Sequence, residues 1–152
     1  MIRYIFLLAI LIGLFISSSQ TYEEQSLIPQ LQEWLPNQPL KELLSILEIP
    51  YWGKIVSVEE RGYYAFVEFL IRKGTHILTF GTLSFAVYLV LPQLRLRFIV
   101  AFLITVIFAF LDEYHQSLTG GRTPAIQDVG LDAIGATLAL ILIYMYNKFK
   151  RP

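Results

Sequence analysis

The sequence predicts an all-α integral membrane protein, a four-helix bundle with amphipathic interfacial helices in its first outer loop. Three observations carry this prediction. The 152 residues are 55% hydrophobic and only 16% charged, and four apolar stretches approach the roughly 20 residues that a helix needs to cross a bilayer. Six basic residues and no acidic ones also lie at the two chain ends and in the connection between the second and third stretches, which alternate onto one side. A chain of this length corresponds to one domain, residues 1–152.

Each predicted span is an apolar stretch with neutral or weakly polar ends. The spans are expected at about residues 3–19, 73–91, 96–114 and 127–147. The intervening residues 20–72 contain too many polar side chains to cross a membrane, and they form the predicted outer segment.

The basic residues predict the orientation of the spans. Six of the twelve, with no acidic residue among them, precede the first span, connect the second to the third or follow the fourth: Arg3, Arg95, Arg97, Lys148, Lys150 and Arg151. All twelve acidic residues lie from Glu23 to Asp132. Because cytoplasmic loops are rich in Lys and Arg, a multi-pass protein of the cell membrane with both termini cytoplasmic is expected. Ser17–Ser19 also fits the cleavage site of a signal peptide, which would remove residues 1–19 and leave three spans.

Within the outer segment, two short amphipathic helices are expected. Apolar residues recur at helical spacing over Leu27–Leu35 and Leu40–Leu47, and a proline follows each run. From Tyr63, another helical run continues into the second span. Both short helices are expected to lie in the membrane interface, although they would alternatively form a lid over a site below them. The aromatic residues expected to anchor them there are Trp34, Tyr51 and Trp52.

Polar residues gather at the outer ends of the predicted spans, whereas the cytoplasmic ends carry only basic anchors. A charge at the centre of a membrane helix costs roughly 2.5–3.5 kcal/mol, and less near its ends. Ionisable residues concentrated at one surface therefore mark a candidate functional site. Its members are Ser18, Gln20, Lys73, His76, Asp112, Glu113, His115, Gln116, Arg122, Asp128 and Asp132.

Asp112, Glu113 and His115 are the candidate catalytic residues of this cluster. Asp112 and His115 are three residues apart on a predicted helix, so the carboxylate is placed to hold the imidazole as a general base. The other members are candidate ligand-binding residues, and Arg122 is suited to gripping a phosphate or carboxylate beside a helix that begins at Thr123–Pro124. His and carboxylate side chains also suit zinc or iron, but no strong metal signature occurs and no metal site is predicted.

The fourth span has a face of small residues. Asp128, Asp132, Gly135 and Ala139 recur at helical spacing. Small residues let a neighbouring helix, expected to be the third span, approach closely. The two carboxylates above them are therefore expected to face the interior of the bundle.

These motifs resemble those of the VanZ-like family of small membrane proteins. The run DEYHQSLTGGRTPAIQDVGLDAIGATLA is similar to the family pattern D-E-x-H-Q, a turn ending in G-R, and D-x-x-x-N/D-x-x-G. SSSQ after the first span and RKGTHILTF at the second are similar to its other two signatures. Asp132 departs from a frequent Asn, and Gly81 from a common Tyr. The resemblance implies a polytopic membrane protein that retains its first span.

The resemblance also connects the chain to the cell envelope, because the family's namesake is linked to low-level resistance to teicoplanin, a glycopeptide antibiotic. Two hypotheses follow. In one, the cluster binds an anionic envelope lipid, a sugar-phosphate headgroup or a glycopeptide-related ligand and performs acid–base chemistry on it. In the other, it is a non-catalytic module whose charges lock the helices together. No cofactor is identified, no basic tract indicates nucleic acid, and the absence of cysteine excludes disulfides and catalytic thiols.

Overall fold

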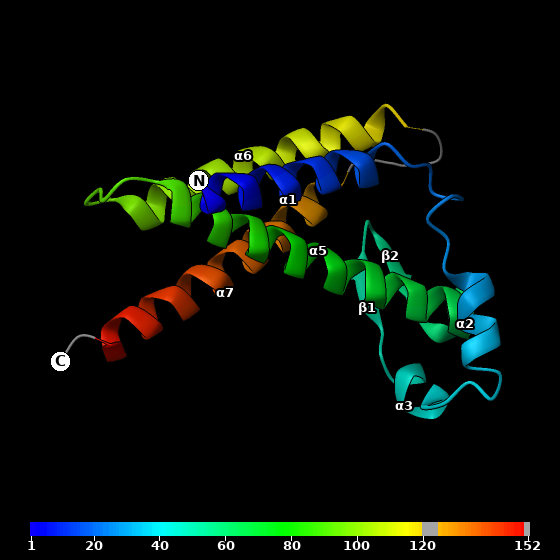
Figure 1. Cartoon of the computed structure of the whole chain (residues 1–152). Coiled ribbons are helices and arrows are strands. Elements are labelled where there is room, and N and C mark those ends of the chain that lie inside the picture. Colours follow the sequence, from blue (N-terminus) through cyan, green and yellow to red (C-terminus); the bar gives the residue numbers. More distant parts are fainter. Residues whose placement is uncertain (120–124, 151–152) are drawn as a thin grey trace.

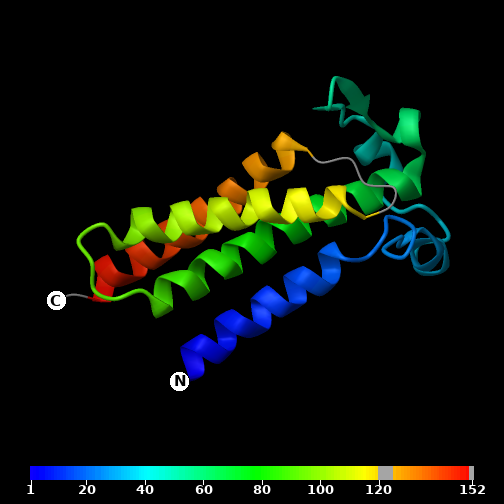
Figure 2. The ribbon, with the colours of Figure 1, turned by 90° about the horizontal axis from the view of Figure 1, so that it is seen from above.

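Four long helices account for the four apolar stretches. The computed structural model of the chain describes residues 1–119 and 125–150. The long helices are α1 (Ile2–Ser18), α5 (Tyr63–Val90), α6 (Arg97–Ser117) and α7 (Ile126–Lys150). They pack along one another with α5 in contact with the other three (Figures 1 and 2). The start of α1 and the end of α7 lie at one end of this assembly, opposite the segment that joins α1 to α5.

By length and composition, two of the described helices, α6 and α7, are able to cross a membrane. Helix α1 is also apolar but has only 17 residues. Helix α5 is continuous over 28 residues, as the sequence predicts, and carries Glu68, Arg72, Lys73 and His76 in its first half. Large apolar side chains are exposed on α1, α6 and α7, among them Phe15, Ile107 and Leu142. Such extensive apolar surface is typical of a protein in contact with lipid.

The closest approach between long helices is that of α5 and α7. A Cβ atom added at Gly135 would lie 2.3 Å from the carbonyl oxygen of Ile77. One added at Gly81 would lie 3.1 Å from the carbonyl oxygen of Gly135. The predicted face of small residues thus packs most tightly on α5. The prediction that its close partner would be the third span was wrong. Helix α6 also contacts α7, but without the glycine-to-backbone approach.

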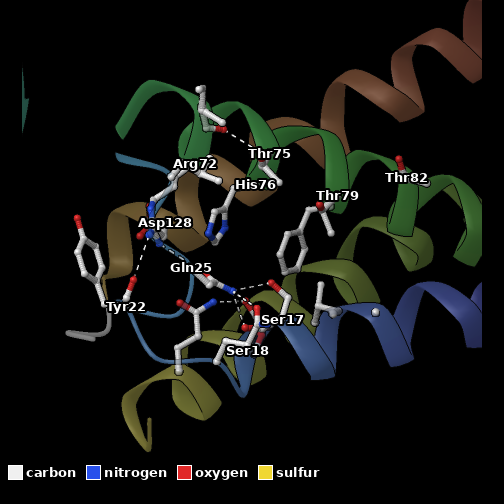
Figure 3. Close-up of a pocket in the computed structure, with 18 of the residues that line it drawn as sticks. Ser17, Ser18, Tyr22, Gln25, Arg72, Thr75, His76, Thr79, Thr82 and Asp128 are labelled. Atoms are coloured by element: carbon white, nitrogen blue, oxygen red, sulfur yellow. Dashed lines mark hydrogen bonds between the residues drawn. The ribbon is translucent and has the colours of Figure 1, made fainter. Parts of the chain in front are cut away.

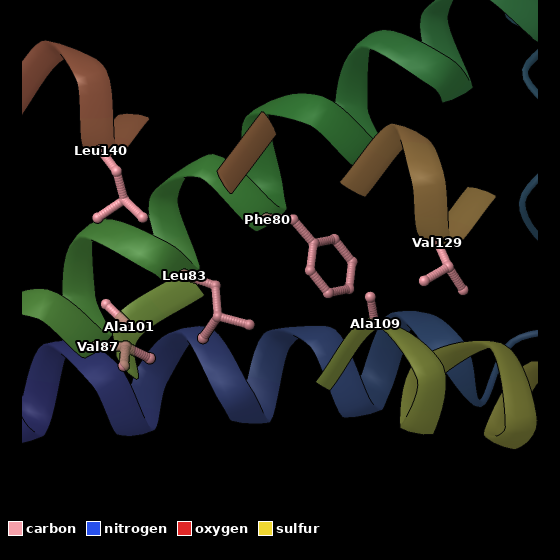
Figure 4. Close-up of a cluster of buried hydrophobic side chains, with 7 residues drawn as sticks. All are labelled: Phe80, Leu83, Val87, Ala101, Ala109, Val129 and Leu140. Carbon is pink, nitrogen blue, oxygen red and sulfur yellow. The ribbon is translucent and has the colours of Figure 1, made fainter. Parts of the chain in front are cut away.

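Apolar side chains fill the space between the long helices below their polar ends. Phe80 and Leu83 of α5 lie in one buried cluster with Ala109 of α6 and Val129 of α7 (Figure 4). The cluster fixes how α5, α6 and α7 pack, and therefore how the polar residues at their ends face each other.

Between α1 and α5 the chain forms a small folded unit. It contains α2 (Ile28–Trp34), α3 (Lys41–Ser45), strands β1 (Ile49–Tyr51) and β2 (Lys54–Val56), and α4 (Val58–Arg61). The unit has its own apolar core, which includes Val56, Val58 and Phe66 and joins it to the start of α5. The two short helices occur where the sequence predicts them.

The hairpin of β1 and β2 corrects the prediction of an all-α fold. Tyr51 pairs with Lys54 in antiparallel register, and the two residues between them, Trp52 and Gly53, have φ values of 56° and 67°. Positive φ at both turn positions matches the two-residue turns that suit the twist of a hairpin, for which Asn-Gly is the usual signal. A Trp-Gly turn lacks that signal, and Pro50 was interpreted only as the end of a helical run.

Candidate functional site

The polar ends of the long helices meet around a pocket of about 900 Å³ (Figure 3). Helices α1 and α5 contribute most of the wall, and the segment at residues 20–27, the hairpin, α4, α6 and α7 contribute the rest. The predicted site residues that line this pocket are Ser18, Gln20, His76, Asp112, Gln116 and Asp128. We call the side chains at this end of the helices the polar layer: Ser18, Glu68, Arg72, Lys73, His76, Asp112, Glu113, Asp128 and Asp132.

Lys73 and Asp128 form an ion pair between α5 and α7, and Tyr51 of the hairpin joins it. The Lys73 Nζ atom lies 2.5 Å from Asp128 Oδ1 and 2.8 Å from the Tyr51 hydroxyl oxygen. The Tyr51 hydroxyl donates to the same Asp128 oxygen. Burial, followed by the hydrogen bond to Asp128, raises the pKa of Tyr51 far above its usual range, so the phenol keeps its proton. These contacts attach the hairpin to the long helices.

Tyr51 is a site residue that the sequence did not reveal. It was grouped with Trp34 and Trp52 as an interfacial anchor, and those two side chains are indeed largely exposed. The hydroxyl of Tyr51 instead reaches residues 22 and 77 positions away in the sequence. No local spacing could indicate contacts of that range.

His76 and Asp132 form a second bridge between α5 and α7, one turn further into the long helices. The His76 Nδ1 atom lies 3.0 Å from Asp132 Oδ1, and Asp132 is fully buried. The other oxygen, Oδ2, has no hydrogen-bond partner among the described residues. With Nδ1 donating to the carboxylate, the Nε2 atom of His76 is the ring nitrogen available to a ligand in the pocket. This is the arrangement that holds a histidine as an acid–base group.

Asp112 has a different role from the one predicted. It accepts a hydrogen bond from the Ser18 hydroxyl of α1 and one from the Gln116 amide, at 2.6 Å. Both of its oxygens are therefore occupied, and it joins α6 to α1.

His115 turns away from Asp112 toward α1. Its ring stacks on Phe15 with centroids 4.8 Å apart, and its Nε2 atom lies 3.4 Å from the Ser19 hydroxyl oxygen. No hydrogen bond joins it to Asp112 in the part of the chain that is described, and it does not line the pocket. A separation of three residues places two side chains on neighbouring parts of a helix surface but does not choose their partners.

Glu113 is buried beside the start of α7. Its Oε2 atom accepts a hydrogen bond of 2.7 Å from the backbone N–H of Ala125, directly before α7 begins. An acidic side chain is favourable at this position because the N-terminus of a helix carries partial positive charge. The Oε1 atom of Glu113 is buried without a partner in the described ranges.

Arg72 brings a cation to the mouth of the pocket. Its Nε and Nη2 atoms lie 2.8 Å and 2.6 Å from Glu68 Oε1, and its guanidinium lies over the ring of Tyr22. Ser26 donates to the other Glu68 oxygen at 3.3 Å. The spacing of Glu68 and Arg72, four residues apart on a helix, was a visible signal of this pair. Nothing in the sequence indicated the ring of Tyr22.

Arg61 also lines the pocket, and it is exposed. Its guanidinium lies over the ring of Phe69 and has no acidic partner among the described residues. Gln20 accepts a hydrogen bond of 3.2 Å from Gln25 at the same mouth. Arg122, expected to grip an anion, lies outside the described residues. Among those described, no group of three or more His, Asp or Glu side chains is arranged to hold a metal ion.

The motifs around this pocket extend over nearly the whole chain, and so does a match to a known family. A family model described as VanZ/LLP1 matches residues 3–147. The chain belongs to the VanZ/LLP1 family. Comparisons with curated proteins and with solved structures give no match. Family membership and the two long apolar helices together indicate a membrane-associated protein.

Proposed function

We propose that this VanZ-family protein is a multi-pass membrane protein whose pocket binds the anionic headgroup of an envelope lipid. In this proposal α1, α5, α6 and α7 all cross the bilayer, both termini are cytoplasmic, and the unit between α1 and α5 lies outside. The basic residues in the first turn of α1 and the last turn of α7 support that orientation. A reporter that is active only outside the cell, fused after Pro152, is expected to give no signal, whereas one inserted near Asn37 is expected to give one.

The observation that carries the binding proposal is the distribution of charge along the pocket. Arg61 and Arg72 lie at its mouth, and Arg61 has no acidic partner among the described residues. Arg72 is paired with Glu68, and the other carboxylates lie deeper, where Lys73, His76, Ser18 and Gln116 already bond to them. An anionic group at the mouth therefore meets cations, while the deeper wall offers polar partners to the ester or hydroxyl groups next to it.

Binding of a water-soluble headgroup tests this proposal. The purified protein is titrated with glycerol 1-phosphate, and Arg61→Gln is expected to weaken binding about tenfold, because a charge-assisted hydrogen bond contributes roughly 1.5–3 kcal/mol. Lys54→Gln is the matched control, because Lys54 is an exposed cation of the adjacent hairpin that does not line the pocket. Equal affinity of the Arg61 and Lys54 variants would refute a cationic mouth.

Acid–base chemistry on the bound ligand is a second candidate function, favoured by the His76–Asp132 pair. We expect His76→Gln to retain headgroup binding but to lose any conversion of isotopically labelled envelope lipids by the reconstituted protein. Because the family's namesake is linked to teicoplanin resistance, susceptibility to that glycopeptide is the cellular measurement. A wild-type protein that binds lipid and alters susceptibility without converting lipid would favour the binding function alone.

A further inference from the structure

The pocket continues well below the polar layer. On α1 its wall runs from Ser18 to Ile10, and on α5 from Arg72 to Thr82. At a rise of 1.5 Å per residue, these stretches are about 12 Å and 15 Å long. The hydrocarbon core of a bilayer is about 30 Å thick. The whole wall of the pocket, polar layer included, therefore has the length of about one leaflet.

Much of the wall of this deeper part is apolar. Ile10, Leu14 and Phe80 contribute hydrocarbon directly. The hydroxyls of Thr75 and Thr82 donate to carbonyl oxygens of their own helix, at 2.9 Å and 2.7 Å. A threonine that satisfies its hydroxyl in this way has no need of a polar ligand.

The same part of the pocket is open along its side. Gly13, Thr75 and Thr82 are exposed although they line it. A Cβ atom added at Gly13 would meet nothing within 4 Å. A space between α1 and α5 is thus accessible from the flank of the helices as well as from the polar end.

We infer that this groove between α1 and α5 holds one acyl chain of an anionic membrane lipid, which enters sideways from the bilayer. The inference rests on the proposed headgroup site, because it joins the apolar groove to the mouth at Arg61 and Arg72 in one pocket of about one-leaflet length. Another helix is a poorer occupant, because a helix with side chains is about 10–12 Å wide. Over 15 Å such a helix exceeds the pocket of about 900 Å³.

Two glycines provide a matched test of the groove. Gly13 lines it, whereas Gly130 lies exposed on α7 and does not line the pocket. In both cases an added Cβ atom meets nothing within 4 Å. Gly13→Leu and Gly130→Leu are both expected to fold, since leucine favours helix over glycine. Only Gly13→Leu places a side chain where the acyl chain would lie.

The probes are phosphatidylglycerol and phosphatidylcholine, each with a photoreactive group in its acyl chain, in phosphatidylcholine nanodiscs that contain the full-length protein. We expect the phosphatidylglycerol probe to crosslink to Gly13–Ser17 and Thr75–Thr82 of the wild type. Gly13→Leu should reduce this yield at least tenfold, and Gly130→Leu should leave it unchanged. Thermal unfolding of both variants confirms that they are folded.

The possible results separate the groove from the headgroup site. Equal crosslinking yields for Gly13→Leu and the wild type, or crosslinks elsewhere on the protein, would refute the proposal that the groove holds an acyl chain. If both probes crosslink equally in the groove and both are lost in Gly13→Leu, the groove stands and the preference for an anionic headgroup fails. Stronger crosslinking of phosphatidylglycerol than of phosphatidylcholine, sensitive to Gly13→Leu, supports both.

Discussion

Two kinds of buried carboxylate lie in the polar layer. Asp112 and Glu68 have hydrogen-bond donors on both oxygens: Ser18 and Gln116 for the first, Arg72 and Ser26 for the second. Asp132 and Glu113 each have a donor on one oxygen, while the other is buried without a partner in the described part of the chain. We call the first kind fully bonded and the second kind half-bonded.

The two kinds of carboxylate differ in what they can do. The fully bonded ones hold side chains in place, whereas the half-bonded ones keep an acceptor oxygen available to a ligand. A fully bonded carboxylate still has free lone pairs, but each of its oxygens already accepts a hydrogen bond, so it gains less from a bound donor. A half-bonded one leaves a buried acceptor unsatisfied, at a cost of roughly 1–3 kcal/mol. A bound donor or proton would relieve that cost. The half-bonded Asp132 also holds His76, which lines the pocket. We therefore expect the two kinds to respond differently to substitution.

The largest effect on stability is expected from disrupting the close packing of α5 on α7, which brings His76 and Asp132 together. Gly135→Leu should destabilise the protein by about 3 kcal/mol or more, because its Cβ atom would lie 2.3 Å from the Ile77 carbonyl oxygen. It would force α5 from α7 and separate the bridged pair with them. Thermal unfolding in detergent measures this effect, with Gly130→Leu as the unhindered control. Unchanged stability would mean that α5 and α7 do not approach closely.

Removing a fully bonded carboxylate should have the next largest effect on stability. Asp112→Asn replaces an acceptor oxygen with an amide that cannot accept from both Ser18 and Gln116. We expect a loss of roughly 1–3 kcal/mol and a proportional fall in protein abundance and lipid binding. The measurements are thermal unfolding and binding per folded molecule. Reduced binding per folded molecule with normal stability would assign Asp112 to the ligand instead.

The half-bonded Asp132 should show the opposite pattern. In Asp132→Asn the amide oxygen still accepts from His76 and the amide nitrogen occupies the unpartnered position, so stability should change by less than about 1 kcal/mol. Conversion of labelled lipids should be lost, because a neutral amide holds an imidazole less well as a base. Stability and chemistry are measured on the same preparation. If Asp132→Asn unfolds as readily as Asp112→Asn, the layer acts as a helix-locking network throughout.

Sequence spacing predicted which residues share a helix face, but not which faces meet. Lys73 and His76 recur three residues apart, and Asp128 and Asp132 four apart, so each pair lies on one face of its helix. Those faces meet in the structure. The same reasoning paired Asp112 with His115, because spacing within one helix does not reveal which neighbouring helix competes for a side chain.

Helices and strands were likewise predictable only where a local sequence pattern specifies them. The four long helices follow from apolar composition over a sufficient length, and α2 and α3 follow from helical periodicity. The hairpin did not follow, because three-residue strands are too short to show alternation and a Trp-Gly turn lacks the usual Asn-Gly signal. The contacts of its Tyr51 hydroxyl are with Lys73 of α5 and Asp128 of α7, so they depend on how these two helices pack.

The smallest effect on stability is expected from removing the Tyr51 hydroxyl. The pH dependence of this effect identifies the role of the hydroxyl. The pKa of Tyr51 is raised by burial and by Asp128, so the folded state favours the neutral phenol. This contribution is complete below the unfolded pKa near 10 and is lost as pH rises through the folded value. Tyr51→Phe should therefore be less stable than the wild type by about 1 kcal/mol or less at pH 7, with the difference shrinking above pH 10. Unfolding midpoints from pH 7 to 11 test this, and Tyr114→Phe, at an exposed tyrosine, is the control. A difference that stays constant with pH would mean that the phenol only fills space, whereas a shrinking one shows that it donates to Asp128.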